Sequence, residues 1–208
     1  MKPILFNYDM VRAILDGRKT VTRRVVKFKP GQNPQWTGYI PDGPVLYGSN
    51  NIPASKSPYH PSDILYVRET WAYGYVDTTD FECRCNECFF EELKAGTKKG
   101  SFLMPRYFYR TENLDGLNVR WRPSIHMPKE AARLFLRVTD VRVERLQDID
   151  DAGVVSEGMN IGDPFDELWD STVKAADRDQ YGWSANPLVW VIEFERVSKE
   201  AALKGGEG

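Results

Sequence analysis

The sequence predicts one α+β domain, built on a mixed sheet or small barrel of about six strands with short helices at its rim. Three observations support this prediction. Stretches of alternating or β-branched apolar residues recur along the chain, and the longest covers residues 134–144. Short segments with apolar residues at helical spacing lie between them, several with capping residues at their starts. The 208 residues are 41% hydrophobic and 28% charged, which is typical of a chain with a buried core.

Charge and hydropathy exclude several classes of protein. The formal net charge of −2 excludes a broadly basic surface, so any contact with nucleic acid must use a local patch. Residues 18–29 and 133–145 carry clustered basic side chains that can form one. No apolar run approaches the roughly 20 residues of a membrane span, so no membrane contact is expected. The absence of a secretory signal and the odd number of cysteines, three, favour a reducing, cytoplasmic setting.

The first elements are expected to be a helix and a strand. Residues 7–15 carry an apolar stripe at helical spacing, Asn7 or Asp9 can cap the start, and Gly17 suits the position after the end. Residues 20–28 are β-branched and loosely alternating, which is typical of a strand.

Two insertions interrupt the predicted domain, which covers residues 1–198. Residues 30–61 are rich in Pro, Gly, Asn and Ser, so a long irregular segment is expected there. Residues 76–102 form the second insertion and hold all the cysteines. Residues 199–208 are expected to be a flexible tail.

The pattern of apolar residues predicts the other elements. Strands are predicted at residues 64–71, 106–110, 117–121, 134–144 and 188–194, and helical segments at 129–133, 148–157 and from 163 or 164 to 176. A change of phase near Asp140 indicates a β-bulge. Asp148 is the predicted cap of the helix at 148–157.

The turn after the first helix has two interpretations. One is a solvated basic turn at the start of a strand. The other is an active centre, in which Lys19 is desolvated enough to act as a base and Thr22 is its nucleophile. Alternation along the strand would place Thr22 and Arg24 on one face, with a hydroxyl and a guanidinium directed into the same cavity.

Four segments of the chain resemble the ASCH family, a relative of the PUA domain. Residues 17–24, Gly-Arg-Lys-Thr-Val-Thr-Arg-Arg, resemble its G-x-K-x-x-T-x-R signature. The strand at 62–71 is similar to its G-D-x-L-x-V pattern, with Ser62 in place of the glycine. The resemblance continues at residues 146–159 and 190–194, and the segments 121–128 and 186–187 look like a phage or prophage-encoded branch.

The resemblance implies a PUA-like barrel with a cleft beside the turn, and binding of RNA or a modified nucleoside. Bacterial N4-acetylcytidine amidohydrolases of the family use a lysine base, a threonine nucleophile and a glutamate proton donor, which correspond to Lys19, Thr22 and Glu157. No cofactor is then required for catalysis. Other members are ribonucleases or binding modules, so both remain alternatives, and Glu157 has the alternative interpretation of an exposed residue at a helix end.

Further residues are candidates for substrate binding: Arg24, Arg68, Glu69, Trp71, His126 and Asn186. Glu69 competes with Glu157 for the carboxylate role, although an Arg–Glu pair at a strand end is also a common structural feature. Trp71 offers a stacking surface for a base, or it is a core aromatic at strand spacing. His126 lies in a proline-flanked loop and is either part of the cleft or an ordinary loop residue.

The cysteines form a C-x-C-x-x-C cluster at Cys83, Cys85 and Cys88. Three thiolates at this spacing suit a structural zinc site, but such a site needs a fourth ligand, for which His60, Glu82, Glu87 and His126 are the candidates. The alternative is a metal-free surface insertion. Elemental analysis of the purified protein distinguishes the two.

Overall fold

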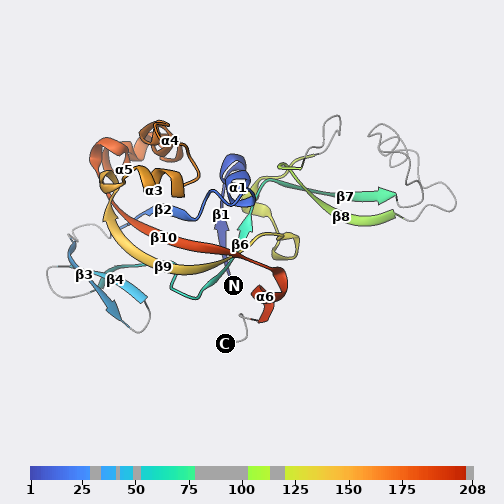
Figure 1. The fold of residues 1–208 in the computed structure, drawn as a ribbon, viewed down its shortest axis with the longest axis horizontal. Helices are drawn as coiled ribbons and strands as arrows, with labels where there is room; N and C mark the ends of the chain where they lie inside the picture. The colour runs from blue at the N-terminus through green and yellow to red at the C-terminus, as the bar shows by residue number, and fades with distance from the viewer. Residues whose placement is uncertain (29–33, 41–42, 49–52, 78–102, 113–119, 205–208) are drawn as a thin grey trace.

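The structure is a computed structural model that describes residues 1–28, 34–40, 43–48, 53–77, 103–112 and 120–204. Its main feature is a five-stranded sheet with the strand order β1-β6-β9-β10-β2 (Figure 1). The five strands are β1 (Lys2–Leu5), β6 (Ile64–Arg68), β9 (Phe135–Arg145), β10 (Leu188–Val197) and β2 (Val21–Val25). Strand β1 runs parallel to β6, and the other neighbours are antiparallel.

The longest pairing, between β9 and β10, contains the predicted bulge. Asp140 pairs with Glu193, and the next pair joins Val138 to Phe194, so Thr139 has no partner across the ladder. The change of phase near Asp140 therefore corresponds to a β-bulge, as the sequence predicted.

Two smaller sheets flank the main one. Strands β3 (Pro34–Ile40), β4 (Gly43–Gly48) and β5 (Pro53–Lys56) form one, and β7 (Trp71–Asp77) and β8 (Leu103–Tyr109) form a hairpin that extends away from the main sheet (Figure 1). The prediction of an irregular segment at residues 30–61 is therefore wrong for the residues that the structure describes there. Pro34 and Pro53 are first residues of strands, where proline is tolerated, and pairing between consecutive strands outweighs the turn-like composition.

The protein is α+β, but none of its described sheets closes into a barrel, which corrects the predicted barrel. Strands β1 and β2 are the two edges of the main sheet. A side chain reaches from one to the other instead of a backbone ladder, since Arg24 Nη2 donates to the Leu5 carbonyl oxygen at 2.9 Å.

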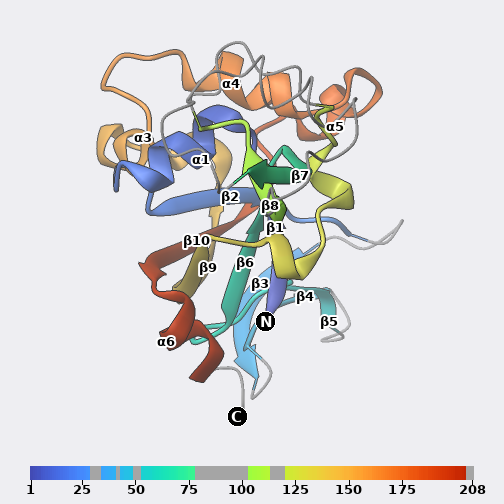
Figure 2. The same cartoon turned by 90° about the vertical axis from the view of Figure 1, so that its right-hand side faces the viewer.

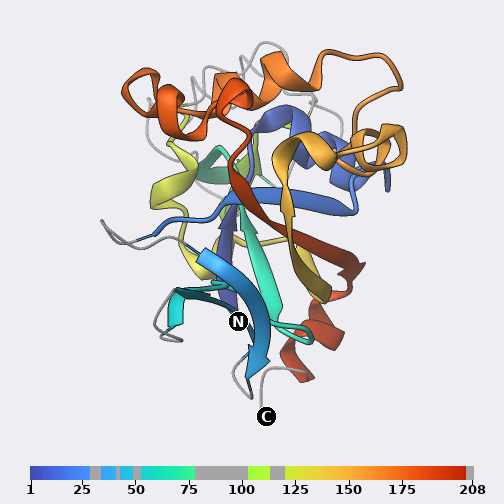
Figure 3. The same cartoon turned by 90° about the vertical axis from the view of Figure 1, so that its left-hand side faces the viewer.

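Short helices surround the sheet. They are α1 (Tyr8–Leu15), α3 (Asp151–Ser156), α4 (Phe165–Thr172), α5 (Arg178–Tyr181) and α6 (Lys199–Lys204), with 3₁₀ turns at Ser124–His126, Lys129–Ala131, Leu146–Asp148, Ala175–Asp177 and Trp183–Ala185. Helices α4 and α5 lie at one end of the molecule and α6 at the other (Figures 2 and 3). Within the described ranges, no helix has the length and apolar character needed to cross a membrane.

Two helix predictions need correction. Helix α3 is capped by Asp150, whose carboxylate accepts from Gly153 N at 2.8 Å, whereas Asp148 belongs to the 3₁₀ turn before it. Residues 199–204 form α6 instead of a tail, because burial of Ala202 against the second hydrophobic cluster fixes this segment.

The core determines which way the residues of β2 face. Along β10, Trp190 and Ile192 belong to the main cluster, while Val189 and Val191 pack under α3 and α4 in another cluster. Strand β10 is therefore buried on both faces. Because Thr22 pairs with Ile192 across an antiparallel ladder, its side chain lies on the side of the main cluster.

Candidate active site at the start of β2

The turn between α1 and β2 positions Lys19. Gly17 N donates to the Ile14 carbonyl at 3.1 Å and Arg18 N to the Ala13 carbonyl at 2.8 Å, the two hydrogen bonds of a Schellman motif. Gly17 has a φ of 75°, which other residues rarely adopt, so it occupies the predicted position after the helix. Lys19 N also donates to Ala13 at 3.0 Å, and this fixes its backbone against the helix end.

Glu157 reaches the same place from the C-terminal part of the chain. It follows α3 directly, forms an isolated β-bridge with Lys19, and is only 7% exposed. The next residue, Gly158, has a φ of 92°, and a Cβ there would lie 2.7 Å from Ala13 Cβ and 3.0 Å from Lys19 Cβ. Glycine is therefore what allows the two segments to approach so closely. Glu157 is a buried residue of this junction, not an exposed helix end.

Lys19 and Glu157 form a buried ion pair. The Lys19 side chain is 0% exposed, and its Nζ donates to Glu157 Oε2, to the Glu157 carbonyl at 3.0 Å and to the Val21 carbonyl at 2.8 Å. Arg23 Nη1 donates to the other carboxylate oxygen, Oε1, at 3.2 Å. An ammonium has three donors, so these three acceptors use all of them. Lys19 is buried although Asp16, Gly17, Arg18 and Thr20 around it are exposed, so the interpretation as a solvated basic turn is wrong for Lys19.

The surroundings of Lys19 make it a weaker base than a lysine in water, so its proton is released more easily. Burial lowers the pKa of Lys19, and the opposing effect of the Glu157 carboxylate is smaller. The positive charges of Arg24 and Arg23 act in the same direction as burial. A buried lysine with a lowered pKa gives up its proton more readily than an exposed one, which is a property of lysines that act as bases.

Thr22 and Arg24 lie beside this pair. Thr22 is 1% exposed, and its hydroxyl is not among the acceptors of Lys19, so a contact between base and nucleophile is not made in this state. The Arg24 Cζ lies 5.4 Å from the centroid of the Phe6 ring, and Lys19 Nζ lies 5.7 Å from the same centroid. Phe6 is thus shared by both cations and is the apolar wall of the site.

In the described part of the chain, none of the other candidate binding residues forms a hydrogen bond or ion pair with Lys19 or Glu157. Arg68 pairs with Leu5 in the sheet and donates from Nη1 to the Ile125 carbonyl at 3.3 Å. Glu69 is held by two bonds from Arg133, at 2.9 and 3.0 Å, so its carboxylate already has a partner. Trp71 is 5% exposed and belongs to the second hydrophobic cluster, as in the alternative interpretation of a core aromatic.

His126 and Asn186 are in turns. His126 is exposed at the end of the 3₁₀ turn Ser124–His126. Asn186 has a φ of 44°, and its side-chain oxygen accepts from Gln147 N at 2.9 Å. Asparagine tolerates this left-handed conformation better than most residues. Asn186 therefore shapes the turn that leads into β10.

The sequence did not indicate Arg23 or Phe6 as site residues. Strand alternation was a usable signal for Arg23. It places Arg23 on the face of β2 opposite Thr22, and α3 covers this face. Phe6 had no signal, because only the fold brings β1 next to the turn.

The predicted zinc ligands Cys83, Cys85 and Cys88 lie outside the described residues. In the part of the chain that is described, no group of three or more His, Cys, Asp or Glu side chains is arranged to hold a metal ion. The zinc site and the metal-free insertion both remain predictions.

No protein-family model, curated protein or solved structure matches this chain. The resemblance to the ASCH family therefore depends on the residues of its four segments, and what it implies for function is taken up as a proposal.

Proposed function

We propose that this protein is an amidohydrolase of the ASCH type, which converts an N4-acylated cytidine to cytidine and the free acid. N4-acetylcytidine, which would give cytidine and acetate, is the simplest substrate of this class. Thr22 is the nucleophile, Lys19 its base, and Glu157 the acid that protonates the departing N4. Arg24, on the same face of β2 as Thr22, stabilises the negative charge of the tetrahedral intermediate.

The observation that carries this proposal is the buried contact between Lys19 and Glu157. The two residues are 138 positions apart in the chain, and the resemblance gives them linked roles in one reaction. Glu157 contacts Lys19, and Lys19 comes two residues before the strand that holds Thr22, which supports a joint role for the three residues. An ion pair elsewhere on the surface would not join the lysine of the signature to the glutamate of a distant segment.

The ion pair supplies the proton arrangement that the reaction needs. Transfer of one proton from Lys19 Nζ to Glu157 Oε2 converts an ammonium and a carboxylate into an amine and a carboxylic acid. When the acid turns to the substrate N4, the lone pair of the amine becomes free to accept the Thr22 proton. Burial lowers the pKa of Lys19 and so promotes the release of this proton.

The reaction then proceeds by acylation and deacylation of Thr22. The Thr22 alkoxide adds to the acyl carbonyl, the C–N4 bond breaks as Glu157 protonates the nitrogen, and cytidine leaves an acyl-threonine ester. Water attacks the ester, the Glu157 carboxylate takes a proton from that water, and the Lys19 ammonium returns its proton to Thr22. The acid is released, and transfer of a proton from Glu157 to Lys19 restores the resting pair.

The test compares substitutions of Thr22 that keep or remove the hydroxyl. Thr22→Val keeps the shape and should reduce the release of cytidine from N4-acetylcytidine by at least about a thousandfold, while Thr22→Ser should retain part of the activity. Chromatography of the products measures the rates. Wild-type protein without turnover, or Thr22→Val with wild-type turnover, would overturn the proposal.

One observation favours a second function, a non-catalytic binding module for RNA or a modified nucleoside. All three donors of the Lys19 ammonium are used in the resting structure, which is also what a structural ion pair requires. A binding module would show affinity for RNA that falls with increasing salt, and no turnover of any acylated cytidine.

A further inference from the structure

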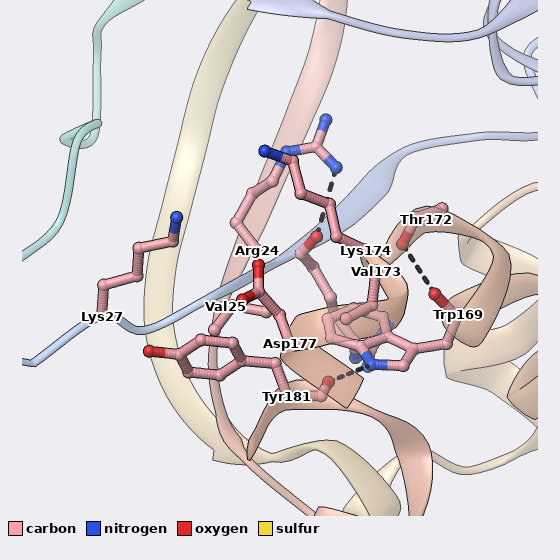
Figure 4. A pocket seen from close by; sticks show the side chains of 10 residues that line it. Arg24, Val25, Lys27, Trp169, Thr172, Val173, Lys174, Asp177 and Tyr181 are labelled. Carbon is pink, nitrogen blue, oxygen red and sulfur yellow. Dashed lines mark hydrogen bonds between the residues drawn. The ribbon is translucent and has the colours of Figure 1, made fainter. Parts of the chain in front are cut away.

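A cavity of about 370 Å³ lies next to the ion pair, between β2 with the residues that follow it and the segment from α4 to α5 (Figure 4). Arg24 and Lys27 line it from one side, and Lys174, Asp177 and Tyr181 from the other. The Trp169 indole donates to the Tyr181 carbonyl at 2.8 Å, which ties α5 to α4 and fixes the far wall (Figure 4). Its volume is in the range of pockets for small molecules.

The lining is strongly cationic. Four basic side chains, those of Arg23, Arg24, Lys27 and Lys174, face one acidic side chain, Asp177. The C-terminal end of α4 adds a partial negative charge of about half a unit. Arg23 is already ion-paired with Glu157 and Glu144, but Arg24, Lys27 and Lys174 together still outweigh Asp177 and the helix end, so the cavity attracts anions.

Several of these cations lack an ionic partner. Arg24 donates to the backbone carbonyls of Leu5 and Arg23, at 2.9 and 3.3 Å. In the described part of the chain, neither Lys27 nor Lys174 has a carboxylate within ion-pair distance. The Arg23 side chain is only 4% exposed, and its Nε is buried without a hydrogen-bond partner in this structure. A buried donor without a partner is costly, and the cations that lack an ionic partner are suitable donors for an anion with several acceptor oxygens.

Two arginines connect the cavity with the proposed active site. Arg23 contributes to the cavity lining and donates to Glu157 Oε1 at 3.2 Å. Arg24 also lines the cavity, and its guanidinium shares the Phe6 ring with Lys19 Nζ. The cavity lies mainly on the face of β2 that α4 covers, whereas Thr22 is on the other face. Because β2 is an edge strand, a ligand with its anionic group in the cavity can reach Thr22 only around the free edge of β2, where Arg24 lies.

We propose that this cavity binds a phosphate group of the substrate, so that the enzyme acts on a phosphorylated acylcytidine and not primarily on the free nucleoside. This inference rests on the proposed hydrolase for its substrate and on the cavity for its phosphate. Arginine and lysine together are the side chains that recognise phosphate. The phosphate belongs either to a mononucleotide or to an RNA strand.

Binding is tested first, without any turnover. Cytidine 5′-monophosphate, cytidine and inorganic phosphate are titrated by calorimetry into wild-type protein, Lys27→Ala/Lys174→Ala, and the control Lys199→Ala/Lys204→Ala. The control removes the same charge from α6, at the opposite end of the molecule (Figures 2 and 3). The monophosphate should bind at least about tenfold more tightly than cytidine, and the cavity variant should lose most of this advantage. The control should retain it.

Measurements of turnover then distinguish a mononucleotide substrate from an RNA strand. kcat/KM is measured for N4-acetylcytidine, its 5′-monophosphate and a short RNA that contains it. A preference for the monophosphate identifies a nucleotide substrate, and a further increase with the RNA identifies a strand; both support the inference. Equal affinity for cytidine and its monophosphate in all variants overturns the phosphate site but leaves the hydrolase intact. Phosphate-dependent binding without turnover of any acylated substrate supports the phosphate site and contradicts the hydrolase.

Discussion

A lysine ammonium that is removed from water keeps its charge only where other oxygens replace the water. Lys19 satisfies this condition with the Glu157 carboxylate and two backbone carbonyls. Arg23 donates to the second oxygen of the same carboxylate. Lys19 and Arg23 therefore share one counter-charge, and the loss of that charge affects both. Residues of this kind show large effects on substitution, since one change leaves several partners unpaired.

Substitution of Glu157 by glutamine tests this dependence. Glu157→Gln keeps the shape of the side chain but leaves Lys19 and Arg23 without their counter-charge, and should lower the free energy of unfolding by about 3 kcal/mol. The loss of the proposed acid should also reduce turnover by at least about a hundredfold. Urea denaturation and product analysis measure the two effects.

Glu195→Gln is the matched control. Glu195 is 55% exposed and pairs with Arg137 on the surface, so its substitution should cost less than about 1 kcal/mol. Equal losses of stability for the two variants would contradict the buried character of the Lys19–Glu157 pair.

Sequence reasoning at the residue scale identified both members of this pair. Lys19 was indicated by the signature at residues 17–24, and Glu157 by the resemblance of residues 146–159 to the same family. Arg23 was missed, because a sequence does not state which cation completes a buried carboxylate. The same limitation applies to Glu69, whose partner is Arg133 and not the neighbouring Arg68.

At the scale of elements, the site depends on the junction of α1, β2 and α3. Two glycines with positive φ form this junction, and they have different surroundings. A Cβ at Gly17 would meet nothing within 4 Å, whereas a Cβ at Gly158 would collide with Ala13 and Lys19. Substitutions at these two glycines therefore distinguish the effect of backbone strain alone from the effect of strain combined with a steric clash.

Alanine substitutions should show this difference. Gly17→Ala should cost about 1 kcal/mol, from the unfavourable φ alone. Gly158→Ala adds overpacking against Ala13 and Lys19 and should cost about 3 kcal/mol in total. It should also reduce turnover, because relief of the clash moves Glu157 relative to Lys19. Thermal unfolding and activity of both variants give the comparison, and indistinguishable variants would refute the role of close approach.

The elements themselves differ in how well they were predicted. Helix α1, with its Asn7 cap and Gly17, and the bulge opposite Glu193 follow from local patterns and were predicted correctly. The sheet of β3, β4 and β5 was not, because proline and glycine describe local turn preference and carry no signal for pairing with a neighbouring strand. Helix α6 was missed because tertiary burial of Ala202 stabilises it.

At the scale of the whole molecule, a polar network fastens the β7–β8 hairpin to the main sheet. The Tyr109 hydroxyl of β8 donates to the Ala131 carbonyl, and the Arg133 guanidinium stacks on the Tyr109 ring with Cζ at 3.9 Å from its centroid. Arg133 in turn holds Glu69 after β6. Burial raises the pKa of Tyr109 to about 12, because the charged phenolate is disfavoured there.

The raised pKa predicts a loss of stability at alkaline pH. Above the unfolded value of about 10, the unfolded chain releases the Tyr109 proton while the folded chain retains it, so the contribution of Tyr109 is complete below about pH 10 and decreases toward pH 12. Tyr109→Phe should cost about 1 kcal/mol at pH 8. The difference between wild type and variant should then shrink as the pH rises above about 10. Denaturation curves from pH 8 to 11 measure this, and a difference that is independent of pH would contradict it.

Sequence by itself determined the α+β class and the end of the first helix at Gly17. Through the family signature, it also indicated the two segments that hold Lys19 and Glu157. These features have local causes: a helix cap, a glycine with positive φ, alternation along a strand, and a signature of a few residues. Local causes can be read without knowledge of the fold.

Only the tertiary structure decided that the main sheet stays open, that Arg23 completes the Glu157 carboxylate, and that a cationic cavity adjoins the site. Each depends on elements that are distant in sequence, because β1 and β2 are opposite edges of the sheet and the cavity forms where β2 meets α4 and α5. Burial and partner choice are properties of packing, and packing is settled by the folded chain as a whole.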